Sequence, residues 1–194
     1  MNALRDTMIA MIFVSMLSLM ALKLSSNTKE HVITTRQSLE TQRNIHLITD
    51  IIENDFRKIG HGLNNPLGAI ALAKNSRIIF AYDQDPSSNF DSIRVEYYTR
   101  KASATPNPND KLIYRKINNT KAQAAALGIT KFKLKYFNGF GNQLPTPVCA
   151  DSLPKIREIE VTIDLQNTRG FKNDYGGAKY KSRIIPKNLL VQYQ

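Results

Sequence analysis

The sequence predicts an α+β protein in which one long N-terminal helix packs on an antiparallel β-sheet. No proline or glycine occurs before Gly60, and apolar residues recur at helical spacing over much of that stretch. Beyond Leu63, short runs of alternating apolar and polar residues are separated by turn residues, as in a half-buried antiparallel sheet. We therefore divide the chain into a transmembrane half-helix over 1–24, an amphipathic half-helix over 25–60 and a β-rich head over 61–194.

The first helical segment is apolar from Met8 to Leu22 apart from two serines. Its length lies between that of a secretory signal core and a full membrane span, and Lys23 extends its reach by snorkelling. A cleavable signal is the rival interpretation, but no pair of small residues suited to cleavage closes the run. Because Arg5 lies on the N-terminal side, the positive-inside tendency places the N-terminus in the cytoplasm and the head outside it.

Asp6 stands at the edge of this apolar segment. A carboxylate there is costly unless something neutralises it. Two interpretations follow. Asp6 lies in the headgroup layer beside Arg5, or it pairs with a cation supplied by a neighbouring protein.

The second helical segment carries an apolar stripe that needs a partner surface, and we expect the sheet of the head to pack on it. Asn27 and Glu30 have the outline of a helix start, so a kink or restart is expected at 25–28. Gly60 and Gly62 are expected to end the helix. The stripe comprises Val32, Leu39, Ile45, Ile48, Ile52, Phe56 and Ile59, widened by Leu47 and Ile51.

The head is expected to consist of short strands closed by the C-terminal residues. Thr120 and Gln123 suggest a capping box for a short alanine-rich helix that Gly128 ends. Cys149 is the single cysteine, and we expect it to be buried and inert; an intermolecular disulfide is the alternative. The expected strands cover 77–82, 93–97, 111–115, 132–136, 159–165, 179–185 and 189–193.

No catalytic constellation, cofactor motif or metal site is predicted. The three histidines, His31, His46 and His61, lack partners at metal-ligand spacing, and His46 with Asp50 indicates a surface hydrogen bond. No nucleophile elbow, P-loop or zinc-protease motif is present in the sequence. These observations disfavour an enzyme.

The net charge of +11 raises the question of an anionic partner. Basic residues are scattered along the whole chain, which favours an ordinary lysine-rich surface. The local exception is the row Lys131, Lys133 and Lys135, which would share one face of a strand and offers a surface that could bind a polyanion. Specific nucleic-acid binding by this row is the disfavoured interpretation. The aromatic residues between these lysines point to the opposite face, so we assign them to the core rather than to a stacking platform.

Several segments resemble type IV pilins and type II secretion pseudopilins. Asn2-Ala-Leu-Arg-Asp-Thr-Met-Ile-Ala-Met11 is similar to the mature start of those proteins. The helix end, Gln42 to Gly60, resembles that of W-type minor pilins and J-type minor pseudopilins. The segments 128–136 and 154–163 resemble paired strands of their heads, and 183–189 resembles their closing strand.

The resemblance implies roles for the first residues. Asn2 holds the position of the processed, N-methylated first residue, and Met1 stands where the glycine recognised by the prepilin peptidase would be. Asp6 holds the position of the acidic residue that the N-terminal amine of an adjacent subunit neutralises. Arg5 replaces an apolar residue of the family pattern. Either the sequence is trimmed to its mature region, or processing is atypical or absent.

The resemblance further implies a structural minor pilin or pseudopilin, without enzymatic activity or cofactor, in the priming or tip complex of a type IV pilus-like or type II secretion filament. Its partners would be other pilin-like subunits, through the N-terminal helix. Before assembly it would be a single-pass protein of the bacterial inner membrane with the head outside the cytoplasm. The alternative function is a membrane-anchored domain that binds DNA or another anionic polymer outside the cytoplasm.

Overall fold

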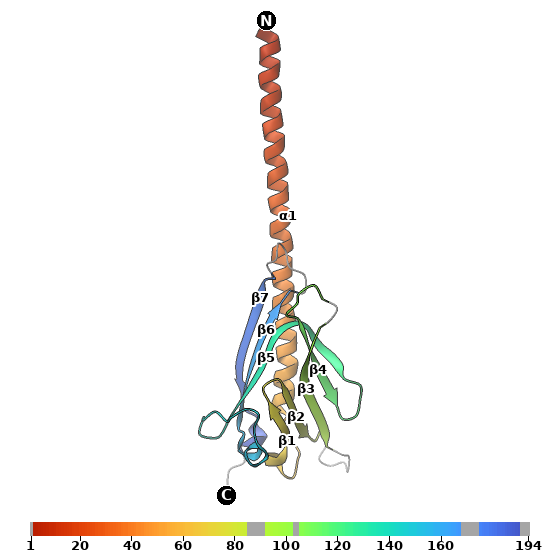
Figure 1. The fold of residues 1–194 in the computed structure, drawn as a ribbon, viewed down its shortest axis with the longest axis vertical. Coiled ribbons are helices and arrows are strands. Elements are labelled where there is room, and N and C mark those ends of the chain that lie inside the picture. The colour runs from red at the N-terminus through yellow and green to blue at the C-terminus, as the bar shows by residue number, and fades with distance from the viewer. Residues whose placement is uncertain (1, 85–91, 103–104, 168–174, 191–194) are drawn as a thin grey trace. The chain divides into compact units, whose positions relative to one another are not determined.

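The computed structural model describes residues 2–84, 92–102, 105–167 and 175–190. One helix, α1 (Asn2–Arg57), is followed by a seven-stranded antiparallel sheet with strand order β1 to β7, in which each strand pairs with its neighbours in the sequence (Figure 1). The α+β prediction is confirmed, and the layout is consistent with a pilin-like fold. The strands are β1 (Ile70–Lys74), β2 (Arg77–Tyr82), β3 (Ile93–Lys101), β4 (Lys111–Ile117), β5 (Gln123–Phe137), β6 (Glu158–Gln166) and β7 (Gly177–Ile184).

The chain divides into two compact units, residues 1–39 and residues 40–194. The described residues of the first unit, 2–39, are all helical. The second, called the head unit here, contains the C-terminal part of α1, the sheet, and three short 3-10 helices: η1 (Pro66–Gly68), η2 (Ala150–Lys155) and η3 (Lys187–Leu189). The helix therefore contributes residues to both units.

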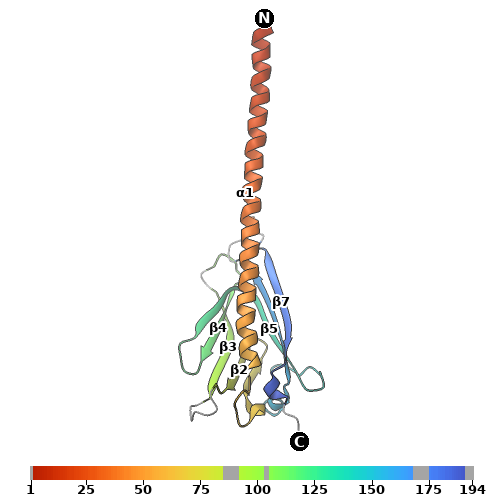
Figure 2. The same cartoon turned by 180° about the vertical axis from the view of Figure 1, so that it is seen from behind.

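Within the head unit, the C-terminal part of α1 crosses one face of the sheet (Figure 2). The ring of Phe56 packs edge-on against Phe80 and Tyr97, with centroid distances of 5.6 and 5.8 Å. The predicted packing of the sheet on the stripe is confirmed for this part of the helix. Its buried members are Ile45, Ile48, Ile52, Phe56 and Ile59, none more than 5% exposed.

The remaining stripe residues are exposed: Val32, Leu39, Leu47 and Ile51. Leu47 and Ile51 lie one residue before the buried Ile48 and Ile52, which on a helix turns them by about 100° away from the sheet. The face covered by the sheet is thus narrower than the predicted stripe.

The predicted restart of the helix is wrong, because α1 continues through residues 25–28 without a break. Asn27, the predicted cap, lies inside this helix. The hydroxyl of the next residue, Thr28, donates a hydrogen bond to the carbonyl of Leu24 at 2.9 Å. The regular helix ends at Arg57 and passes into turns up to Gly62. Gly60 adopts a φ of +77°, and a Cβ there would lie 3.2 Å from the Cβ of Pro66.

Two further predictions about the head are wrong. The alanine-rich segment after Thr120 is the start of β5, because pairing with β4, including Tyr114 with Ala124, outweighs the helical preference of alanine. Cys149 is exposed, since it lies in the loop that leads into η2. The sequence also failed to indicate β1, which has only five residues, four of which (Ala, Leu, Ala and Lys) favour helix.

Most of the predicted strands are confirmed. The expected strands at 77–82, 93–97, 111–115, 132–136 and 159–165 lie within observed strands. The one at 179–185 begins two residues after the start of β7 and ends one residue after its end. The closing strand at 189–193 is not observed at its start, because Leu189 belongs to η3. Residues 191–193 of that prediction lie outside the described part of the chain.

Candidate functional site

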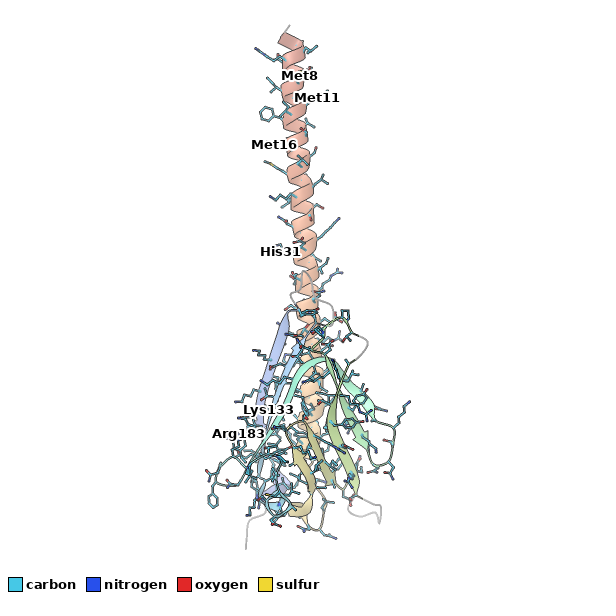
Figure 3. The ribbon with its side chains drawn as sticks, viewed as in Figure 1. Met8, Met11, Met16, His31, Lys133 and Arg183 are labelled. Carbon is cyan, nitrogen blue, oxygen red and sulfur yellow. The ribbon has the colours of Figure 1, made fainter. Side chains whose placement is uncertain are left out.

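The first unit is an exposed apolar helix. Met8, Met11 and Met16 project from it with no other part of the unit packed on them (Figure 3). α1 is long and apolar enough to cross a membrane, and its most apolar window is entirely unburied. The large exposed apolar side chains of this segment are Leu4, Met8, Ile9, Met11, Ile12, Phe13, Val14, Met16, Leu17, Leu19, Met20, Leu22 and Leu24.

The small polar residues of the segment are satisfied within the helix. The hydroxyls of Thr7, Ser15 and Ser18 donate to the carbonyls three or four residues earlier, at 2.8–2.9 Å. Such bonds lower the cost of placing a hydroxyl in an apolar medium. Arg5, Asp6 and Lys23 therefore remain as the groups that oppose burial in lipid.

Asp6 and Arg5 face each other at 3.8 Å, between a carboxylate oxygen and Nε. Their side chains are 67% and 72% exposed, so in this single chain the pair lies on an open helix surface. An exposed pair of this kind contributes little to stability. Of the processing candidates, Asn2 is the first residue of α1 and Met1 lies outside the described residues.

A buried charge network that the sequence reading missed connects α1 to the sheet. Asp55 of α1 is 4% exposed and accepts hydrogen bonds from the Tyr97 hydroxyl at 2.6 Å and from Arg115 Nε and Nη2 at 2.6 and 3.1 Å. Burial and the nearby carboxylate raise the pKa of Tyr97, and the hydrogen bond to Asp55 raises the pKa of Arg115. The tyrosine therefore stays neutral and the arginine charged at physiological pH.

A signal for this network was present in the sequence. Asp55 lies three residues after Ile52 and four before Ile59, which places a carboxylate on the buried face of the helix. An acidic residue at such a position requires a cation from the surface that covers it.

A second contact joins α1 to β7. The Tyr180 hydroxyl donates to the carboxylate of Glu53, and Arg57 Nη2 lies 3.2 Å from the same carboxylate. The hydrogen bond from Tyr180 lowers the pKa of Glu53; burial opposes this shift, and Arg57 adds to it. One turn of helix thus carries two carboxylates that bind different strands.

The predicted lysine row lies on one face of β5, as expected, but its charge is largely compensated. Lys131 Nζ is 3.8 Å from Asp164, and Lys135 Nζ is 3.8 Å from Glu160. Lys133 is opposite Thr162 and forms no ion pair within the described part of the chain. Two of the three lysines are therefore paired across the strand boundary.

The acidic residues of β6 are shared with β7 on the other side. Glu160 lies 3.4 Å from Lys181 Nζ and 3.7 Å from Arg183 Nη2. Glu158 accepts a hydrogen bond from Arg183 at 3.3 Å. Figure 3 shows Lys133 and Arg183 on this half of the sheet. The β5–β7 half is a ladder in which an acidic strand lies between two basic ones, so it is a weaker polyanion surface than the lysine row alone suggested.

Among the described residues, no group of three or more His, Cys, Asp or Glu side chains is placed to hold a metal ion. His61 Nδ1 lies 2.9 Å from the carbonyl oxygen of Asp83, while His31 lies on the exposed helix. In the same described ranges, His46 and Asp50 form no hydrogen bond, so the predicted surface contact is wrong.

The fold and the exposed helix define an α+β protein with an N-terminal helix that can anchor it in a membrane. No protein-family model matches the chain, and no curated protein matches it.

Proposed function

We propose that this chain is a structural subunit of an extracytoplasmic helical filament, of the minor pilin or minor pseudopilin kind. One observation carries the proposal: the core of the head unit is complete without the first unit. Among the described residues, the core cluster contains no side chain before Ile45. The apolar surface of the first unit is thus left for lipid before assembly and for neighbouring helices afterwards.

The proposed filament also accounts for Asp6. In an apolar helix bundle an unpaired carboxylate costs a few kcal/mol, so a cation from the next subunit would fix the register between helices. The first residues resemble those of pilins, and this resemblance implies that the cation is the N-terminal amine of an adjacent subunit. The Arg5 contact at 3.8 Å is exposed and weak enough to be exchanged for it.

The helix-end resemblance and the large head support a place in the priming or tip complex. Before assembly the protein is a single-pass protein of the inner membrane with its head outside the cytoplasm. The role is structural rather than enzymatic. Where the prepilin peptidase acts, Asn2 becomes the N-methylated first residue, and mass spectrometry of the N-terminal peptide from native membranes tests this step directly.

Assembly is tested by capturing the full chain from native membranes and identifying what co-purifies. We expect other pilin-like proteins with the wild type and at least a tenfold loss with Asp6→Ala, since about 1.4 kcal/mol corresponds to a factor of ten. Asp50→Ala removes the same charge from an exposed site of the same helix and should leave recovery unchanged. Equal recovery with Asp6→Ala would refute the register role, and recovery of the chain alone would refute the filament.

A further inference from the structure

The outer side of strands β2–β4 carries a second group of basic and aromatic residues that the sequence analysis did not connect. Ile78, Tyr97 and Ile113 of these strands are fully buried in the core, so the residues that alternate with them project from the opposite side of the sheet. We call this surface the tyrosine–arginine face. Its basic and aromatic members are Arg77, Arg94, Tyr98, Arg100, Tyr114 and Lys116, and its acidic member is Glu96.

A stacked tyrosine pair lies at the centre of this face. Tyr98 and Tyr114 are directly opposite each other on β3 and β4. Their rings are 5.3 Å apart at an interplanar angle of 13°. The guanidinium of Arg100 lies over both rings, 5.2 Å from one centroid and 5.6 Å from the other. Both tyrosines remain partly exposed, so this planar cluster is open to a ligand from solvent.

The cations of the face are in excess of its acids. A groove of about 530 Å³ is lined by Lys74, Arg77, Glu96, Tyr98, Arg100 and Lys116, among others. An adjoining groove of about 450 Å³ shares Arg77, Glu96 and Lys116 and adds Arg94. Five basic residues therefore line the two grooves against one acidic residue.

That acidic residue is already neutralised, because Glu96 lies 2.7 Å from Arg77 Nε. Arg94, Arg100 and Lys116 form no ion pair within the described residues. Arg94 and Arg100 are separated along β3 by about 20 Å, the length of a few nucleotides. This is the opposite of the β5–β7 ladder, where cations and acids are paired.

We infer that the tyrosine–arginine face binds single-stranded nucleic acid. Cations placed along a strand contact successive phosphates, and aromatic rings between them stack on bases of any sequence. A sheet face with exposed aromatic residues is a known geometry for this kind of recognition. An acidic protein would pair with the cations but would have no bases to stack on the two rings. The tyrosine pair therefore favours a nucleic acid over an acidic protein as the ligand. This role extends beyond filament assembly and does not depend on it.

The test uses the full chain in micelles of an uncharged detergent. Fluorescence anisotropy is measured with labelled mixed-sequence DNA and RNA strands of about 16 nucleotides, the upper range of common site sizes, over a series of salt concentrations. Log affinity falls as log salt rises, and each phosphate contact contributes about 0.7 to the steepness of that fall. The variant Arg94→Gln/Arg100→Gln/Lys116→Gln should therefore make the slope shallower by about 2. The control Lys131→Gln/Lys133→Gln/Lys135→Gln removes equal charge from β5 and should leave the slope unchanged.

The tyrosine pair is tested separately from charge. Tyr98→Leu/Tyr114→Leu should weaken binding of the labelled strands about tenfold, the expected loss from removing base stacking. Tyr98→Phe/Tyr114→Phe keeps both rings and should retain wild-type affinity. Polyphosphate and polyglutamate, which have no rings, should bind the leucine and phenylalanine variants equally. Circular dichroism checks the fold of each variant. The single variant Arg100→Gln removes the cation that lies over both rings and leaves the rings themselves unchanged, so it should also weaken binding of the labelled strands.

Equal losses in the two charge variants would show that binding follows total charge and would overturn the assignment. Wild-type affinity in the leucine variant would overturn base stacking, and preferential binding of polyglutamate would assign the face to an acidic protein instead. A difference between the DNA and RNA strands would identify which of them the face favours. Absence of binding to either strand at low salt would refute the inference.

Discussion

Asp55 connects the buried face of α1 to two strands of the sheet. It is a carboxylate on the buried face of a helix, with three donor atoms from two strands converging on it. A buried ion pair of this kind adds little net stability compared with apolar residues of the same size, but removing one partner leaves the other charge uncompensated. Loss of either partner should therefore be costly even though the intact pair adds little.

Asp55→Ala should lower the free energy of unfolding by about 3–5 kcal/mol, since Arg115 and the Tyr97 hydroxyl lose their partner. Urea unfolding of the detergent-solubilised chain, followed by tyrosine fluorescence, measures this because the sequence contains no tryptophan. Asp50→Ala, at an exposed site of the same helix, should change stability by no more than about 0.5 kcal/mol. Similar values for the two variants would show that the buried network contributes nothing specific.

Asp110 provides a pH-dependent prediction at the same scale. Its carboxylate is fully buried, and neither oxygen has a hydrogen-bond partner among the described residues. Burial raises the pKa of Asp110. The folded state therefore holds this proton more tightly than the unfolded chain, and stability falls as the pH rises from the ordinary aspartate pKa, about 4, through the raised folded value.

The asparagine side chain of Asp110→Asn cannot ionise. At neutral pH this variant should therefore have a free energy of unfolding about 1–2 kcal/mol above that of the wild type, and a higher melting temperature. The advantage should shrink towards pH 4. The lowered pKa of Glu53 acts in the opposite sense, since its stabilisation is lost as the pH falls, but it is common to both proteins and cancels. Thermal melts across this pH range check the prediction; a difference that does not vary with pH would contradict it.

At the scale of elements, α1 packs against the sheet along only part of its apolar circumference. Ile52 is 1% exposed, whereas its neighbour Ile51 is 42% exposed. Both residues are isoleucines at adjacent positions of α1, so they differ mainly in burial. Replacing each of them by alanine changes helix preference equally, so the difference between the two variants measures the packing of Ile52 on the sheet.

Ile52→Ala should destabilise the head by about 2–5 kcal/mol, because it removes buried atoms and leaves a cavity between helix and sheet. Ile51→Ala should change stability by about 0.5 kcal/mol or less. Urea unfolding of both full-length variants in detergent makes the comparison. If Ile51→Ala were equally costly, the exposed face would be packed on something in the isolated protein.

At the scale of the whole molecule, the first unit carries a large exposed apolar surface. Leu17, 64% exposed, lies within the apolar segment, and Leu39, 60% exposed, lies beyond it on the same helix. Leu17→Arg places a charge in the segment at a cost of about 2.5–3.5 kcal/mol to membrane insertion. It should release part of the protein on alkaline carbonate extraction of membranes, whereas Leu39→Arg should remain in the pellet. Equal extraction of both would place the membrane contact elsewhere.

The apolar segment, the helical spacing and the alternating strands were readable from the sequence because they are local patterns, with periods of about 3.6 and 2 residues that their own neighbours reveal. These local patterns were enough to predict the α+β class, the long helix and most strands. It failed where tertiary pairing overrides local preference, as in the alanine-rich start of β5. The partners of Asp55, the compensation of Lys131 and Lys135, and the meeting of Tyr98 with Tyr114 were decided only by the sheet. Strand register joins residues distant in the sequence, and no local pattern carries that information.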